Sequence, residues 1–254
     1  MRRLTVGVAV AAVTLVAACG DNSGSGPASS STTTTTTATS ATKPPIAQAA
    51  LSSLLLTPAE FDSVLGVTGS ASKEKIDKLQ DDVTKQPPGP PGWKFPDECI
   101  YTQGPAEAPV YAGSGSTAVS GDADVTSLGN DQDVMVGQVV VLFPSAKEAN
   151  DFFATSAQRW PACADRQINP PPGGDGTQTT FKIGPFSNAN GILSVTQTTT
   201  MTMSGQPDAM TVTVQRALTA RNNVVVDVVL MRKDPADFGV KVAAQIAGKI
   251  DKQQ

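Results

Sequence analysis

Two charged residues stand inside apolar segments in the C-terminal quarter of this chain. Arg216 interrupts the apolar face of a predicted strand over residues 210–220, and Asp227 interrupts the valine run 224–229. We interpret both as candidate ligand-binding residues, which would point into a polar cleft or pair with each other across adjacent strands. The alternative is that each lies on a solvent face or near a strand end.

Trp93 is the third candidate ligand-binding residue. It follows the proline-rich segment 87–91, in a long connection where proline prevents regular secondary structure. Its ring would either stack on a ligand or pin the loop onto the core.

The sequence offers no familiar set of catalytic residues. It contains no histidine, which removes Ser-His-Asp and Cys-His catalysis, histidine zinc sites and imidazole pH switches. The Gly-Ser-Gly-Ser turn at 113–116 lacks a base, and the carboxylate pairs at 81–82 and 97–98 are typical of solvated loops. We therefore expect no enzymatic activity and no cofactor, and a histidine-free hydrolase or transferase remains as the enzymatic alternative.

Oxygen-bearing residues between 122 and 133 raise the question of a calcium-binding loop. They are Asp122, Asp124, Asn130, Asp131 and Asp133. Their spacing does not fit the EF-hand pattern, so we interpret the segment as a solvated turn and predict no metal site.

The overall charge excludes one class of partner. The chain has 19 Lys and Arg residues against 23 Asp and Glu residues, a net charge of −4, whereas a nucleic-acid-binding protein needs a basic face. We expect no nucleic-acid partner.

The N-terminus has the pattern of a bacterial export signal. A basic start (Met1-Arg2-Arg3) precedes an uncharged segment, 4–18, that is long enough for a signal peptide and too short to span a bilayer. The tetrapeptide Val16-Ala17-Ala18-Cys19 resembles the lipobox of bacterial lipoproteins. This resemblance implies that residues 1–18 are a signal peptide and that acyl chains such as palmitate on Cys19 anchor the protein to the outer face of the cell membrane. An ordinary secretory signal with an incidental cysteine is the alternative.

A linker is predicted to follow the anchor. Twelve of the fifteen residues 28–42 are Ser or Thr and show no apolar periodicity, so the segment cannot bury a core. We assign residues 19–50 to this disordered linker, either O-glycosylated or bare, and residues 51–254 to one folded domain.

Two cysteines remain once Cys19 is acylated. Cys99 and Cys163 form an even pair in an exported chain, for which a disulfide is the default. Two free thiols and a metal-binding pair are the alternatives.

Helix signals occur at three places in the predicted domain. Thr57-Pro58-Ala59-Glu60 forms a capping box that opens a short helix ending at Gly66, and Ser145 opens another helix that continues to Trp160. Asp234 and Pro235 open a last helix, whose apolar residues recur every four positions. A weak helix is also predicted over residues 73–83.

Strand signals dominate the rest of the domain. Residues 99–101, the glycine-interrupted segment 110–128 and residues 134–143 have strand character. Four further strand segments follow, at 181–183, 192–203, 210–220 and 224–231, joined by turns short enough for antiparallel hairpins. In segment 210–220, one face is predicted to be buried and the other solvated. The fold class is α+β: a single domain with an antiparallel β-sheet flanked by helices.

Several motifs, in their order along the chain, resemble those of the extracellular sensor domain of PknH-type receptor kinases of actinobacteria. This domain also occurs in stand-alone lipoproteins. The resemblance spans roughly residues 51–250. The motifs are residues 54–61 (LLLTPAEF), Cys99, 111–115 (YAGSG), 139–146 (VVVLFPSA), 160–163 (WPAC) and 224–228 (VVVDV) with the helix that follows.

This resemblance implies an antiparallel sheet flanked by helices and a cleft for an unidentified ligand. It also implies a disulfide that maps onto Cys99 and Cys163. Family members often carry a second disulfide, for which this chain has no cysteines, so the loop 164–176 is expected to be less constrained. Without a kinase domain, the protein would not relay a signal by itself.

Two functions follow as expectations. The first is a lipid-anchored module outside the cytoplasm that reversibly binds a small molecule or an envelope component in a cleft. The second is a structural or assembly lipoprotein that contacts another envelope protein through a sheet face or edge.

Overall fold

The structure, a computed structural model, describes residues 43–81, 90–127, 133–205 and 208–253. Cys19, the predicted signal peptide and most of the predicted linker lie outside these residues. Within them, no helix has the length and apolar character needed to cross a bilayer.

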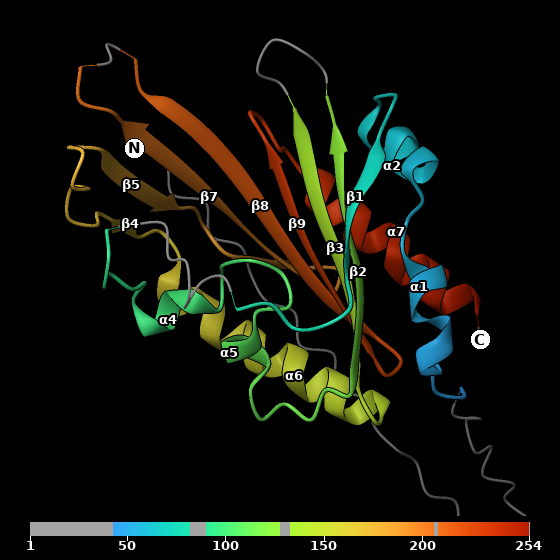
Figure 1. Ribbon diagram of the computed structural model, residues 1–254. Helices are drawn as coiled ribbons and strands as arrows, with labels where there is room; N and C mark the ends of the chain where they lie inside the picture. The colour runs from blue at the N-terminus through green and yellow to red at the C-terminus, as the bar shows by residue number, and fades with distance from the viewer. Residues whose placement is uncertain (1–42, 82–89, 128–132, 206–207, 254) are drawn as a thin grey trace, which may run out of the picture. The chain divides into compact units, whose positions relative to one another are not determined.

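Helices and strands alternate irregularly along the described chain (Figure 1). The helical elements are η1 (Gln48–Ala50), α1 (Leu51–Leu54), α2 (Pro58–Leu65), α4 (Asp97–Ile100), α5 (Ala108–Tyr111), α6 (Ala146–Arg159), η2 (Trp160–Cys163) and α7 (Phe238–Lys252). The strands are β1 (Ala71–Ile76), β2 (Ala118–Thr126), β3 (Val134–Leu142), β4 (Gln167–Ile168), β5 (Gln178–Ile183), β6 (Ser187–Ala189), β7 (Ile192–Thr202), β8 (Met210–Arg221) and β9 (Val224–Arg232).

All named strands join one nine-stranded sheet in the order β1-β2-β3-β9-β8-β7-β5-β4, with β6 paired to β7. Every pairing between these strands is antiparallel. The long hairpin β8–β9 turns at Asn222, whose φ of 50° is a conformation that asparagine tolerates better than most residues. The predicted fold class, an α+β domain with an antiparallel sheet and flanking helices, is confirmed.

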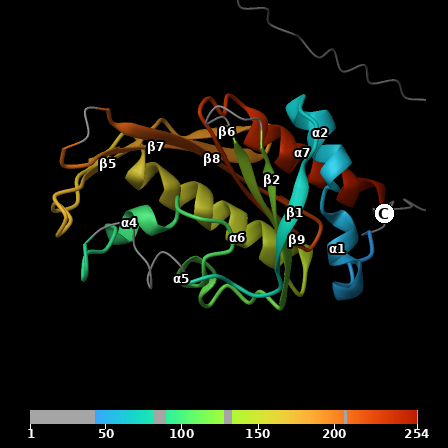
Figure 2. The ribbon, with the colours of Figure 1, turned by 45° about the horizontal axis from the view of Figure 1, so that its top comes forward.

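Helices cover both faces of the sheet. One apolar cluster packs α7, α1 and α2 against one face, and a second packs α6 and α5 against the other. Figure 2 shows α1 and α2 beside α7, with α4 and α5 beside α6. The central strands β3, β8 and β9 lie between the two layers, which is why apolar residues follow one another continuously in much of β3 and β9.

The three predicted helix starts have different outcomes. Thr57 and Glu60 form the predicted capping box of α2, and Gly66 ends that helix at φ 67°. Ser145 caps α6 through the backbone N–H of Glu148. The last helix begins at Phe238, later than predicted, because Ala236 adopts a φ of 43°. A side chain from the sheet caps it instead: Gln215 Oε1 accepts from the N–H groups of Gly239 and Val240.

Several predictions about secondary structure are wrong. Residues 71–76 form the edge strand β1 where a weak helix was predicted over 73–83, because pairing with β2 satisfies their backbone. Residues 97–100 form one helical turn, α4, with Asp97 and Glu98 at its N-terminus, where a strand was predicted at 99–101. The segment 110–128 begins within α5 and becomes strand only at Ala118.

Two further predictions need correction. In β8, both faces are buried over residues 215–220, because α7 covers the face that was predicted to be solvated. The packed residues also begin before Leu51. Ile46 is buried and its N–H donates to Asn223 Oδ1 at 2.7 Å, so residues 46–50 belong with the domain and not with the linker.

Candidate ligand-binding groove

A row of side chains crosses the sheet on the face that α6 partly covers. Directly opposed residues of antiparallel strands point to the same face. Met135 opposes Met231, Met231 opposes Val214, and Val214 opposes Gln197. Val212, two residues before Val214 in β8, opposes Thr199. The register of the sheet therefore places methionine, valine and threonine side chains together from segments far apart in sequence.

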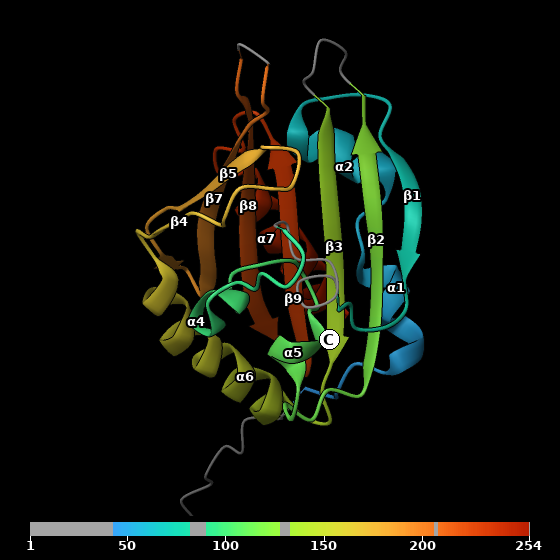
Figure 3. The ribbon, with the colours of Figure 1, turned by 60° about the vertical axis from the view of Figure 1, so that its left-hand side comes forward.

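Most of this row, namely Gln197, Thr199, Val212, Val214 and Met231, lines a groove with a volume of about 640 Å³, and Met135 lies beside Met231 at its margin. Pro90 and Pro91 contribute to its lining from one segment, and Pro171, residues 173–175 and Thr177 contribute from another. A smaller hollow of about 220 Å³ adjoins it, because Gln197 and Val214 line both. Figure 3 shows α4, α5 and α6 crossing one end of this sheet face.

Two methionines, Met201 and Met231, line the groove, and further methionines lie on the same face of the sheet. Met135, Met201, Met210 and Met231 share this face through the register, and Met203 follows β7 directly. Met135, Met203 and Met210 are the exposed large apolar residues of the described chain, at 45%, 44% and 49% exposure. Because methionine is unbranched and polarizable, it suits a surface that adapts to different apolar shapes.

A buried ion pair lies at the smaller hollow, which Arg216 lines. Arg216 Nε donates to Asp227 Oδ1 at 3.1 Å, and Arg216 Nη2 donates to Asp227 Oδ2 at 2.8 Å. The side chains are 1% and 0% exposed. Arg216 lies on β8 and Asp227 on β9, two residues from the position directly opposite Arg216. The predicted pairing across adjacent strands is therefore confirmed, and the solvent-face alternative is wrong.

Surrounding groups complete the hydrogen bonding of this pair. Asp227 Oδ2 also accepts from the N–H of Ala106 and from the hydroxyl of Tyr111, both at 2.9 Å. Arg216 Nη1 donates to the carbonyl oxygens of Tyr101 and Gln103 at 2.9 and 2.6 Å. Burial and the negative charge of Asp227 raise the pKa of the Tyr111 hydroxyl well above its ordinary value, so this hydroxyl remains a donor.

The smaller hollow therefore has a mainly apolar lining with a few polar groups and no net charge. Arg216 lines it together with Thr102, Gln103 and Gln197, and the charge of Arg216 is balanced by Asp227. Gln103 Nε2 donates to Gln197 Oε1 at 3.1 Å. Arg216 thus positions the segment that carries Gln103, and it presents little exposed surface of its own to a ligand.

Trp93 packs against aromatic residues at the side of the groove. Its ring lies 4.8 Å from Phe95 and 5.9 Å from Phe181, measured between centroids, and is stacked on Phe181. Phe181 itself lines the groove. These contacts favour the interpretation that Trp93 pins its loop onto the core.

A disulfide joins Cys99 in α4 to Cys163 at the end of η2, with a Cα–Cα distance of 5.0 Å. The predicted bond is confirmed, and the free-thiol and metal-pair alternatives are wrong. Because α4 directly precedes Tyr101 and Gln103, the bond also holds the carbonyl groups that accept from Arg216.

The other residues considered for chemistry lie elsewhere. Asp122 and Asp124 are on β2, where Asp122 accepts from Ser72 and Lys75 and Asp124 accepts from Gln138; Asn130 and Asp131 lie outside the described residues. Glu98, from the pair at 97–98, accepts from Arg166. The turn at 113–116 contains Gly113 and Gly115 at φ 72° and 81°.

A cleft was expected from the family resemblance, but neither its position on the sheet nor the residues that line it were predicted from the sequence. Gln103, Gln197 and Tyr111 were not singled out as site residues, and neither were the methionines. The only signal available was the recurrence of Met at strand positions that share one face, and its meaning depends on which strands become neighbours.

Comparison with known proteins places this arrangement among related domains. Residues 46–249 match the family described as "PknH-like extracellular domain". The chain is 30% identical over 210 residues to "Serine/threonine-protein kinase PknH" of Mycobacterium bovis and of Mycobacterium tuberculosis, which covers 82% of this chain. It covers 32% and 30% of those two relatives, so it spans about a third of their length.

A solved structure agrees with the sequence matches. The crystal structure of the extracellular domain of PknH from Mycobacterium tuberculosis superposes with a TM-score of 0.65 at 27% identity, covering 82% of this chain and 98% of that one. The chain described here therefore belongs to the PknH-like extracellular domain family.

Proposed function

We propose that this protein is a lipid-anchored lipoprotein of the cell envelope whose extracytoplasmic domain binds a small molecule or envelope component in the groove, reversibly and without chemistry. The observation that carries this proposal is the groove of about 640 Å³ on the sheet. It combines an apolar floor with a few fixed polar groups, which is the usual composition of a ligand site. Membership of an extracellular domain family supports a location outside the cytoplasm.

Two adjacent positions on β8 provide the test of groove binding. Val212 lines the groove, whereas Thr211 is exposed on the opposite face. The neutral fluorescent probe N-phenyl-1-naphthylamine is titrated into the wild type, Val212→Trp and Thr211→Trp. We expect Val212→Trp to weaken binding by about tenfold or more, equivalent to about 1.4 kcal/mol, and Thr211→Trp to bind like the wild type. Equal affinity of the two variants would contradict the proposal.

The anchor is tested separately through Cys19. Cells expressing the protein are fed an alkyne-labelled palmitate and then fractionated. We expect the wild type to carry the label in the membrane fraction, and Cys19→Ala to be unlabelled and to leave that fraction, because a single cysteine holds the acyl chains. A wild type that is secreted without label would establish the ordinary secretory alternative.

A protein partner is the second candidate function, and the exposed side chains of Met135, Met203 and Met210 favour it. Exposed apolar groups rimmed by polar residues are also found at protein interfaces. A photo-crosslinking residue at position 210 would then capture an envelope protein, whereas the same residue at the exposed position 211 on the other face would not. Crosslinking at neither position would argue against this candidate.

A further inference from the structure

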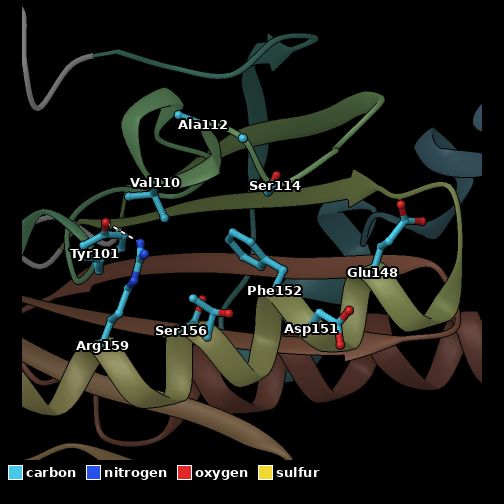
Figure 4. A pocket seen from close by; sticks show the side chains of 11 residues that line it. Tyr101, Val110, Ala112, Ser114, Glu148, Asp151, Phe152, Ser156 and Arg159 are labelled. Atoms are coloured by element: carbon cyan, nitrogen blue, oxygen red, sulfur yellow. Dashed lines mark hydrogen bonds between the residues drawn. The ribbon is translucent and has the colours of Figure 1, made fainter.

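Another hollow lies between α6 and the segment that carries α5 (Figure 4). It is separate from both the groove and the smaller hollow beside the groove. Its volume is about 280 Å³, and it shares no lining residue with the groove. Figure 4 shows side chains that rise from α6 toward the turn that carries Ala112 and Ser114. The hollow is therefore a distinct candidate site.

One face of α6 supplies most of its lining. Residues 148, 151, 152, 155, 156 and 159 are spaced by three and one positions alternately, which places them on a single side of a helix. Phe152 and Val110 form a buried apolar base, and Phe152 stacks on Tyr111 at 4.3 Å between ring centroids. Ser114, Thr155 and Ser156 add hydroxyl groups to the lining.

Opposite charges mark the two ends of the hollow. At one end, Arg159 donates to the Tyr101 hydroxyl and lies 4.5 Å from the centre of its ring. No carboxylate of the described residues forms an ion pair with Arg159. At the other end are two carboxylates, Glu148 and Asp151.

The two carboxylates keep capacity for a further donor. Asp151 Oδ2 accepts from the exposed side chain of Lys147 at 2.6 Å, and Glu148 Oε2 accepts from Ser145 Oγ at 2.8 Å. Each ionised carboxylate has about four lone-pair sites on its two oxygens. A ligand ammonium group can therefore join both without displacing these partners.

The separation of the charges sets the length of a suitable ligand. Asp151 and Arg159 are eight residues apart on α6, and a rise of about 1.5 Å per residue puts them about 12 Å apart along the axis. An extended peptide spans at most about 3.3–3.6 Å per residue, so about three or four residues bridge this distance. The small volume admits only small side chains.

We propose that this hollow binds a short extended peptide of about three or four small residues. Its C-terminal carboxylate is held by Arg159 and its free amine by Glu148 and Asp151. The polar groups are carried by a rigid element, since α6 is capped by Ser145 and continues into η2, which the disulfide fixes. The proposal does not depend on what occupies the groove.

The test uses the full mature chain with tri-alanine and tetra-alanine as probes. Binding is measured by calorimetry for the peptides with free termini, with an acetylated amine and with an amidated carboxylate. We expect the free peptides to bind and each blocked terminus to weaken binding by about tenfold, about 1.4 kcal/mol.

Substitutions then assign each terminus to its end of the hollow. Arg159→Gln should lower the affinity of the protein for the free peptide by about tenfold. This variant should also bind the free and the amidated peptides equally well. The double variant Glu148→Gln, Asp151→Asn should bind the free and the acetylated peptides equally well. Arg166→Gln is the matched control, because Arg166 is also a partly exposed arginine but pairs with Glu98 outside the hollow.

Three outcomes would overturn the proposal: absence of binding at millimolar peptide, equal binding of free and blocked peptides, and equal losses in Arg159→Gln and Arg166→Gln. Unfolding curves for every variant distinguish a lost contact from a lost fold. Val212→Trp, which blocks the groove, should leave peptide binding unchanged.

Discussion

At the scale of single residues, the Arg216–Asp227 pair is an arrangement with a high desolvation cost, because both side chains are buried. Removing two charges from water costs several kcal/mol per ion, which only close pairing and complete hydrogen bonding can offset. Both conditions are met here, since the pair is bidentate and accepts further bonds from Ala106 and Tyr111. Two remote segments are thereby fixed to the middle of the sheet.

Asp227→Asn should therefore destabilise the domain by about 3–5 kcal/mol, because the substitution leaves the Arg216 charge buried without a counter-charge. Urea unfolding measures the loss. The matched control is Asp251→Asn, which removes a 3.7 Å pair between Arg221 and a half-exposed carboxylate and should cost about 1 kcal/mol or less. Similar losses of unfolding free energy for both substitutions would show that the buried pair contributes no more to stability than the exposed one.

Asp124 is another buried carboxylate, and it lies on the α7 side of the sheet. Gln138 donates to Asp124 Oδ2 at 3.2 Å, but Oδ1 has no hydrogen-bond partner among the described residues. Burial, and next the charge of Asp122, raise the pKa of Asp124 from 3.8 to about 6. The folded state then keeps a proton between about pH 4 and pH 6 that the unfolded chain has released, so stability falls as the pH rises through this range.

Asp124→Asn should stabilise the domain above pH 6.5 and have little effect near pH 4. At 1.36 kcal/mol per pKa unit, the shift to about 6 sets an upper limit of about 3 kcal/mol. Unfolding free energies measured from pH 4 to pH 8 check this, with the exposed residue Asp208 changed to Asn as the control. A gain that is the same at all pH values would contradict the assignment.

At the scale of elements, the short helical turns are held by links to other elements. The one-turn helix α4 is fixed by the Cys99–Cys163 bond to η2 and by the two carbonyl groups that follow it and accept from Arg216. A single helical turn is unstable alone, because nucleation fixes several residues for one hydrogen bond. The disulfide and the ion pair thus support the same segment.

Replacing both Cys99 and Cys163 by Ser should lower the free energy of unfolding by up to about 4 kcal/mol for a loop with a sequence separation of 64. The urea midpoint measures this loss, and hydrogen exchange at residues 101–104 should accelerate along with it. Reductant should destabilise the wild type and leave the double variant unchanged. A wild type that is equally stable under oxidising and reducing conditions would contradict this account.

At the scale of the whole molecule, the layers on the two faces are unequal. On one face, α7 with α1 and α2 covers the central strands, while on the other face α6 leaves part of β9, β8, β7 and β5 to form the groove. Two of the exposed methionines, Met135 and Met210, stand directly opposite the groove-lining residues Met231 and Met201. Oxidation of methionine makes an apolar side chain polar, so the groove should be more sensitive to oxidation than the fold.

Mild peroxide should oxidise Met135, Met203 and Met210 first, because these are the exposed methionines. We expect the affinity for N-phenyl-1-naphthylamine to fall by about tenfold while the thermal unfolding midpoint changes little. Peptide mapping by mass spectrometry identifies the oxidised residues. A variant with leucine at all three positions should bind the probe and resist peroxide. Unchanged binding by the oxidised wild type would exclude these side chains from the site.

The sequence by itself determined the features that depend on near neighbours in the chain. The caps at Thr57 and Ser145, the long strands, the α+β class and the disulfide partner of Cys99 all follow from local pattern or from the small number of cysteines. Each of these was correctly predicted, because helix starts, alternation and cysteine pairing carry local or countable signals.

Only the tertiary structure decided the rest. The strand β1, the turn α4 and the start of α7 at Phe238 depend on groups supplied by β2, by η2 and by Gln215, all distant in sequence. The groove is formed by strand register, which brings Met135, Met231 and Val214 into one row. No periodicity within a segment encodes which segments become neighbours, because long-range pairing is chosen by the packing of the whole domain.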